Sequence, residues 1–115
     1  MKAADKNSII IEVPFPPELE SEGMAIVERA EGPDLVLLKV GGTYCGVDRE
    51  CPHEEGDLGE GLMFGRNIKC PVHGYIFDMT TGKCLNSRGY WAQVYGVEVR
   101  GASLVLQPRQ EPDSR

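Results

Sequence analysis

The sequence has little histidine, little positive charge and no long apolar segment. Two of its 115 residues are histidine, and 12 Lys and Arg residues stand against 18 Asp and Glu residues, which gives a net charge of -6. Nucleic-acid binding depends on clustered positive charge, so this composition argues against it. The longest apolar run falls far short of the roughly 20 residues that span a bilayer. We therefore expect neither a nucleic-acid partner nor a membrane-spanning segment.

Signals for export are also missing. Residues 1–7 contain no apolar segment ahead of the strand-like Ser8–Val13, which argues against a secretory signal. Of the four cysteines, two belong to the motif described below and two are far apart in sequence, so a reducing cytoplasm is the simpler location. With 41% apolar and 26% charged residues, the chain is typical of a soluble globular protein that folds without disulfides. We expect one domain over residues 1–115, and a monomer.

Short apolar runs separated by turn residues predict an all-β fold. Many short strands with frequent turns are typical of an antiparallel sandwich or barrel. The predicted strands are Ser8–Val13, Met24–Arg29, Asp34–Val40, Thr43–Val47, Asn67–Lys69, Tyr75–Asp78 and two final strands, containing Val94, Val97, Val99, Leu104 and Leu106, that are joined at Arg100–Ala102. Glycines and prolines between the second, third and fourth of these runs indicate two successive hairpins.

Three segments are predicted to lie outside the strands. Pro14–Gly23 contains three prolines and reads as a turn, with one possible helical turn at Glu18–Glu22. Glu50–Gly61 carries three glycines among charged residues, which favours a loop. Residues 108–115 have the composition of a disordered tail.

The candidate functional residues form two similar motifs, Cys51-Pro52-His53 and Cys70-Pro71-Val72-His73. Together the motifs use both histidines and half of the cysteines. Two thiolates and two imidazoles can hold a Rieske [2Fe-2S] centre, in which one sulfur and one nitrogen come from each loop, or a Cys2His2 zinc ion. A disulfide between the two cysteines would leave both histidines unexplained.

The residues after the second motif favour the iron-sulfur alternative. His73-Gly74-Tyr75-Ile76-Phe77-Asp78 followed by Thr81-Gly82 resembles the CPxHGxxFD...TG pattern of the Rieske family, and the resemblance extends from about Met24 to Gln107. It implies a Rieske-like sandwich or barrel of antiparallel strands. It also implies a small cluster-binding subdomain, over about residues 50–80, formed by two loops.

The resemblance also assigns roles to single residues. It implies that Cys51 and Cys70 bind one iron of a [2Fe-2S] cluster and that His53 and His73 bind the other. Pro52 and Pro71 would stiffen the ligand loops, because proline fixes φ and lacks an N–H group. Gly74 would let the backbone approach the cluster closely.

Departures from the respiratory branch of the family indicate a low reduction potential. That branch has a disulfide between the two loops, but the corresponding positions here are Gly56 and Val72. Where it has a serine and a tyrosine hydroxyl that bond the cluster sulfurs, this chain has Tyr75, whose hydroxyl can still donate, and Phe77, which cannot. Fewer hydrogen bonds to sulfur stabilise the reduced state less, which places the potential toward the low end of the range of about -150 to +300 mV. In this respect the chain is similar to the ferredoxins that serve Rieske-type oxygenases.

The remaining conspicuous residues have less specific interpretations. The first loop carries the acidic residues Glu54, Glu55, Asp57 and Glu60, which would lower the reduction potential further. They either form a docking patch for a basic partner or are simply solvated. We expect Cys45 to be a small buried apolar residue, Cys84 to lie in a turn and neither to be a ligand. We expect Tyr90 and Trp91 to fill the core. The third loop, Leu85–Gly89, lacks the proline that many family members have there, so its shape is not predicted.

These observations predict an electron-transfer component and not an enzyme, because no nucleophile–base pair or phosphate loop remains once both histidines are ligands. The leading hypothesis is a soluble carrier that passes single electrons from a reductase to a terminal oxygenase. A second hypothesis is a small subunit of a larger oxidoreductase, such as a nitrite reductase. A third is a redox-sensing interaction module.

Overall fold

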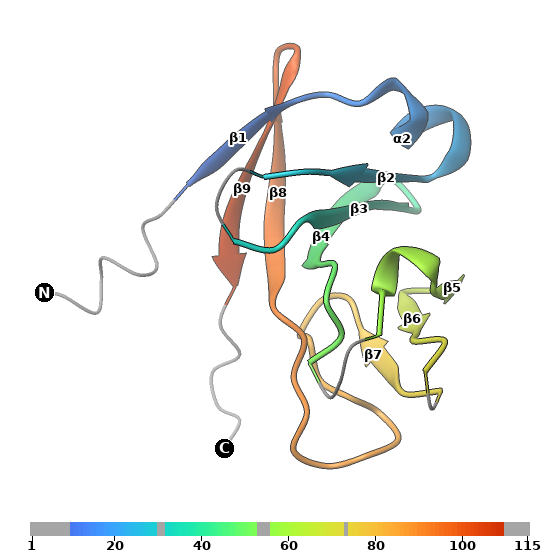
Figure 1. Cartoon of the computed structure of the whole chain (residues 1–115). Coiled ribbons are helices and arrows are strands. Elements are labelled where there is room, and N and C mark those ends of the chain that lie inside the picture. The colour runs from blue at the N-terminus through green and yellow to red at the C-terminus, as the bar shows by residue number, and fades with distance from the viewer. Residues whose placement is uncertain (1–9, 30–31, 53–55, 73, 110–115) are drawn as a thin grey trace, which may run out of the picture.

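The computed structural model describes residues 10–29, 32–52, 56–72 and 74–109. In these residues it contains one short α-helix, one 3-10 helix and nine strands (Figure 1). The helices are α2 (Pro17–Glu22) and the 3-10 helix Leu58–Glu60. The strands are β1 (Ile11–Pro14), β2 (Met24–Val27), β3 (Leu35–Val40), β4 (Thr43–Asp48), β5 (Leu62–Phe64), β6 (Asn67–Lys69), β7 (Ile76–Asp78), β8 (Val94–Arg100) and β9 (Ser103–Arg109). The predicted all-β class is confirmed.

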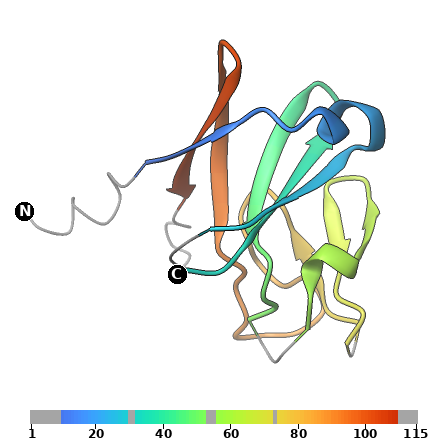
Figure 2. The ribbon, with the colours of Figure 1, turned by 45° about the horizontal axis from the view of Figure 1, so that its top comes forward.

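Six strands form one antiparallel sheet in the order β1-β9-β8-β4-β3-β2. The two successive hairpins β2-β3-β4 are confirmed, and Gly41, with φ of 61°, occupies the turn between β3 and β4. Gly101, with φ of 59°, occupies the turn between β8 and β9, where glycine tolerates a positive φ that other residues rarely adopt. The tip of this second hairpin projects beyond the other strands (Figures 1 and 2).

Strand β3 is buried on both faces, which explains its continuous apolar run. Leu35 and Leu37 pack into one core, together with Val13, Leu19 and residues of β9. Their neighbours Val36 and Leu38 point to the opposite face and belong to a second core. The large sheet therefore separates two apolar layers, and the second layer contains Cys51 and Cys70.

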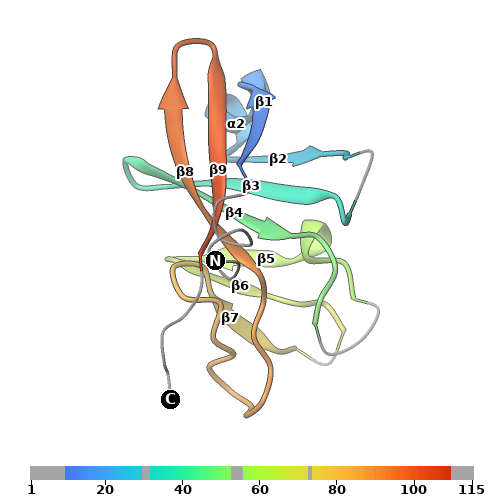
Figure 3. The same ribbon diagram turned by 90° about the vertical axis from the view of Figure 1, so that its left-hand side faces the viewer.

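A smaller sheet of three strands, in the order β5-β6-β7, lies between β4 and β8 in sequence. Figures 1 and 3 show it below β3 and β4, with the long β7–β8 connection curling beneath it. The buried side chains Ile68 and Phe77 face the second core, so this sheet closes that layer from the other side. Strand β5 was not predicted. The interpretation of Glu50–Gly61 as a loop was wrong for Leu58–Glu60, where the Asp57 carboxylate accepts a hydrogen bond from the Gly59 N–H and starts a 3-10 turn.

The first strand and the end of the last strand differ from the prediction. β1 includes Pro14, which pairs with Ser103 at the edge of the sheet, where proline is tolerated because no partner needs its missing N–H. Residues Pro108 and Arg109 belong to β9 and pair with β8, although the disordered tail was predicted to begin at residue 108. The helical turn in the Pro14–Gly23 segment is confirmed as α2.

The prediction that Trp91 fills the core was wrong. Its side chain is 41% exposed, whereas the next residue, Ala92, is buried. Trp91 forms an isolated bridge with Lys83, and the Ala92 N–H donates to the Gly82 carbonyl at 2.7 Å. In such an extended segment neighbouring side chains point to opposite sides, so Ala92 points inward and Trp91 outward. Tyr90 is partly buried against the second core, with its ring centroid 5.2 Å from that of Tyr75. None of the helices in the described residues is long and apolar enough to cross a membrane.

Candidate metal centre

Two of the four predicted ligands lie in the described residues. Cys51 and Cys70 are both buried, with exposed fractions of 4% and 0%, and both belong to the second core. His53 and His73 lie outside the described residues, as do Glu54 and Glu55. The described part of the site is therefore its sulfur side.

Each cysteine begins a tight loop that is closed by its own backbone N–H. The Cys51 N–H donates to the carbonyl of Gly56 at 2.9 Å, and the Cys70 N–H donates to the carbonyl of Tyr75 at 2.7 Å. Cys70 directly follows β6, and Cys51 follows soon after β4, so both loops start from strands. Because strands are more rigid than loops, this arrangement fixes the backbone position from which each cysteine side chain projects.

Gly56 brings the two loops together. A Cβ atom added at this position would lie 2.4 Å from Sγ of Cys70, 3.1 Å from Cβ of Cys51 and 3.5 Å from Cβ of Val72. The two cysteines, one from each motif, therefore flank a single backbone position that has no room for a side chain. Residues 56 and 72, the positions of the disulfide in the respiratory branch, face each other here without cysteines.

An ion-pair network supports the first loop. Nε and Nη2 of Arg49 bond the two carboxylate oxygens of Asp57 at 3.0 and 3.1 Å, and Nη1 bonds Asp34 at 3.2 Å. The hydrogen bond from Arg49, aided by the Gly59 N–H, lowers the pKa of Asp57. Asp57 thus has a structural role. Neither interpretation of the acidic residues from the sequence, a docking patch or a solvated loop, had included this role. Glu60, in contrast, is exposed. Sequence reasoning missed Arg49, because nothing in the local sequence links it to Asp57.

The Phe-Asp part of the family pattern, Phe77 and Asp78, lies beneath the second loop. Phe77 is fully buried in the core that contains both cysteines. The Asp78 carboxylate accepts hydrogen bonds from the N–H and hydroxyl of Thr80 at 2.7 and 2.5 Å. Burial opposes ionisation of Asp78, but these hydrogen bonds outweigh it and lower its pKa. Phe77 and Asp78 of the pattern therefore fix the chain around the site, together with Thr80, which directly precedes Thr81-Gly82.

The two other cysteines are buried in the same core. Cys45 lies in β4 as predicted, and burial raises the pKa of its thiol. Cys84 forms an isolated bridge with Phe77, and its thiol lies 3.4 Å from Oδ1 of Asn86. Asn86 was not recognised from the sequence, where it appeared only as part of a loop without proline.

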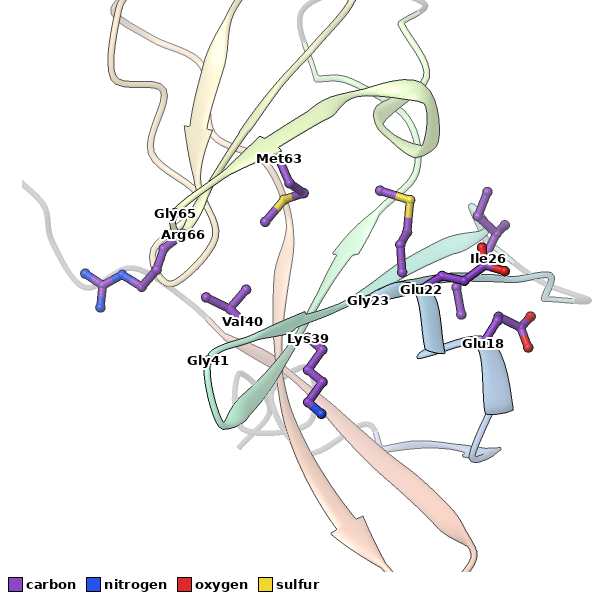
Figure 4. Close-up of a pocket in the computed structure, with 12 residues that line it drawn as sticks. Glu18, Glu22, Gly23, Ile26, Lys39, Val40, Gly41, Met63, Gly65 and Arg66 are labelled. Atoms are coloured by element: carbon purple, nitrogen blue, oxygen red, sulfur yellow. The ribbon is translucent and has the colours of Figure 1, made fainter. Parts of the chain in front are cut away.

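A separate groove lies between the edge of the large sheet and the β5-β6 hairpin. It is lined by residues of α2, β2, β3, β5 and the β5–β6 turn, including Glu22, Ile26, Lys39, Met63 and Arg66 (Figure 4). Neither Cys51 nor Cys70 is among the described residues that line this groove. A smaller hollow, lined by Leu62, Lys69, Cys70 and Gly74 among others, does reach the second ligand loop.

Comparison with known proteins identifies the class of this site. The Rieske [2Fe-2S] domain family matches residues 11–95. The ferredoxin component of a naphthalene 1,2-dioxygenase system from Pseudomonas putida is 38% identical over 64 residues, which cover 56% of this chain and 62% of that protein. A chain in the complex of reduced oxygenase and oxidized ferredoxin in carbazole 1,9a-dioxygenase has 25% identity and a TM-score of 0.76, over 93% of this chain and 100% of that chain. A Sphingomonas yanoikuyae B1 ferredoxin has 26% identity and a TM-score of 0.67, over 74% of this chain and 84% of that chain.

The chain therefore belongs to the Rieske [2Fe-2S] domain family, as its sequence motifs predicted. The matched part spans 62% of the length of the Pseudomonas relative. The cofactor of this family is a [2Fe-2S] cluster, and the described residues fit it. Two cysteines from separate loops lie beside the same glycine, in an apolar layer that excludes water from the sulfur side.

Replacing Gly56 by alanine tests this arrangement. The added methyl group would occupy the space beside Sγ of Cys70, so one loop must move away from the other. We expect the Gly56→Ala protein to fold but to retain much less iron and sulfide per chain than the wild type, measured by chemical analysis and visible absorbance. Gly42→Ala is the matched control, because a Cβ at Gly42 meets no atom within 4 Å. Full cluster content in Gly56→Ala would contradict the described contact.

The Arg49–Asp57 ion pair predicts a pH-dependent contribution to stability. Because the folded state lowers the pKa of Asp57, its carboxylate stabilises the fold above the usual Asp pKa of about 3.9, and this contribution is lost as the pH falls through the lower folded value. Asp57→Asn should be less stable than the wild type near neutral pH, and the difference should shrink in acid. Urea unfolding across this pH range measures it, with Glu12→Gln, on β1, as the charge-matched control. A difference that does not change with pH would argue against the ion pair.

Proposed function

We propose that this protein is a soluble one-electron carrier, a ferredoxin that passes electrons from a reductase to a terminal oxygenase. The observation that carries the proposal is the meeting of two Cys-Pro motifs at Gly56, in a member of the Rieske family. The resemblance to ferredoxin components of dioxygenase systems supports the choice of partners. We place it in the cytoplasm, as a monomeric single domain.

The proposed ligands are Cys51, His53, Cys70 and His73. Cys51 and Cys70 would anchor one iron at the buried side of the site, and the two histidines would bind the other. When bound, the cluster takes up and releases one electron, and the neutral imidazoles raise its potential relative to an all-cysteine cluster. The chain's own contribution is to hold the thiols in place through the two loop-closing hydrogen bonds and to keep water from them.

We propose a potential in the lower part of the Rieske range. Phe77 is fully buried beneath the second loop and offers no hydroxyl to a sulfur. A role of the Tyr75 hydroxyl as a donor to sulfur stays a prediction. The net charge of -6 also disfavours the addition of an electron, and it suits a partner surface that carries positive charge.

Two other functions differ from this proposal in measurable ways. A small subunit of a larger oxidoreductase would copurify with its partner in fixed stoichiometry. A redox sensor would bind its partner with strongly different affinities in the oxidised and reduced states, whereas a carrier that exchanges between partners should show only a small difference. The retention of all four predicted ligands in the sequence favours a working cluster in each case.

Cysteine substitutions separate ligands from core residues. Cys51→Ala and Cys70→Ala should abolish the visible absorbance of the cluster and the rhombic paramagnetic signal of the reduced protein. Cys45→Ala and Cys84→Ala should keep both, at some loss of stability, because these thiols are buried in the same core without being proposed ligands. A colourless wild-type protein that contains zinc would refute the proposed function, and so would a cluster that persists in Cys70→Ala.

A redox titration followed by visible absorbance tests the proposed reduction potential. We expect a midpoint in the lower half of the range of about -150 to +300 mV. Phe77→Tyr should raise it, because a new hydroxyl near the second loop can donate to sulfur. A wild-type midpoint near the top of the range would contradict the argument from Gly56, Val72 and Phe77.

A further inference from the structure

The side chain of Asn86 joins the third loop to the second ligand loop. Its Oδ1 accepts a hydrogen bond from the N–H of Ile76 at 3.0 Å, and its Nδ2 donates to the carbonyl of Gly74 at 3.1 Å. The same Oδ1 lies 3.4 Å from the thiol of Cys84, in range for a weak S–H donor. An exposed asparagine thus uses both ends of its amide on the protein and not only on water.

The pattern of partners determines the orientation of the amide. Two donors, the Ile76 N–H and the Cys84 thiol, face one end, and one acceptor, the Gly74 carbonyl, faces the other. The reversed orientation would put an NH2 group against an N–H and an oxygen against a carbonyl, both of which repel. The contacts therefore agree with one another and favour one orientation of the Asn86 amide.

These contacts hold residues 74–76, the segment that closes the Cys70 loop. Gly74 and Ile76 flank Tyr75, whose carbonyl accepts the hydrogen bond from the Cys70 N–H on the inner side. The N–H of Leu85 adds a bond of 2.7 Å to the Ile76 carbonyl. The backbone of residues 74–76 is thus held from the inside by Cys70 and from the outside by Asn86. Gly74, whose carbonyl Asn86 binds, directly follows the proposed ligand His73.

We propose that Asn86 is a positioning residue for the second ligand loop and that Cys84 supports it. No cysteine stands at position 56 or 72, so a covalent link cannot join the ligand loops there, and noncovalent contacts must hold them. Asn86 supplies such contacts to the second loop. It does so from the β7–β8 connection, which curls beneath the small sheet in Figure 1. The inference rests on the proposed function, since it assumes that Cys70 and His73 bind the cluster.

Asn86→Ala removes all three contacts and tests the proposal in the cluster-loaded protein. We expect iron to be released to a ferrous chelator roughly tenfold faster or more, the size that outer-shell substitutions have on metal affinity. We also expect the g values of the reduced protein to shift, because the second loop no longer has one fixed shape. Asn86→Asp keeps the acceptor but turns a second oxygen toward the Gly74 carbonyl, so it should change both quantities in the same direction.

Two controls separate positioning from general stability. Ser87→Ala alters the same loop at a residue that makes no hydrogen bond within the described residues and is not a proposed ligand, and it should match the wild type. Val13→Ala weakens the other core, which contains Leu35 and Leu37 and neither ligand cysteine. It should therefore lower the thermal unfolding midpoint without changing the g values. Wild-type iron release and g values in Asn86→Ala would overturn the inference, and so would equal changes in Val13→Ala. A cluster that survives in Cys70→Ala would instead overturn the proposed function.

Discussion

The close approach of the two ligand loops at Gly56 is the constraint on which the metal centre depends. A glycine at this position lets Cys51 and Cys70 pack around one stretch of backbone that a methyl group would push apart. Its carbonyl also accepts the bond that closes the Cys51 loop. One residue without a side chain thus fixes both the shape of the first loop and its distance from the second.

The two sheets supply the frame for this contact. β3 buries both of its faces, so the large sheet stands between two apolar layers, and the small sheet closes the layer that holds the cysteines. The second loop begins directly after β6, and the first follows β4. The two sheets bring Cys51 and Cys70 close to each other, and a few further hydrogen bonds hold the loops that follow them. Those bonds come from Arg49 and Asp57 for the first loop and from Asn86 for the second.

The features that could be predicted from the sequence are those with local signals. Apolar runs and turn glycines indicated the strands of the large sheet, and the repeated Cys-Pro pairs indicated the proposed ligands. Strand β5 has the apolar sequence Leu62-Met63-Phe64, but three apolar residues between Gly61 and Gly65 do not by themselves indicate a strand, and two of them are exposed; β5 forms by pairing with β6. The contacts of Arg49 with Asp57 and of Asn86 with Gly74 join separate segments, so spacing along the chain does not reveal them. Trp91 is exposed because it alternates with the buried Ala92 in a short bridged segment, which composition cannot indicate.

The central claim is that one cluster is held by sulfur from the buried side of both loops and by nitrogen from the two histidines. Pulsed electron paramagnetic resonance of the reduced protein tests it most directly, because nitrogen nuclei bound to iron produce hyperfine couplings that thiolates do not. The account predicts couplings from two imidazole nitrogens, which lose their ¹⁴N pattern when the protein is grown with ¹⁵N-labelled histidine. A reduced cluster without nitrogen couplings, or with those of a single imidazole, would contradict it.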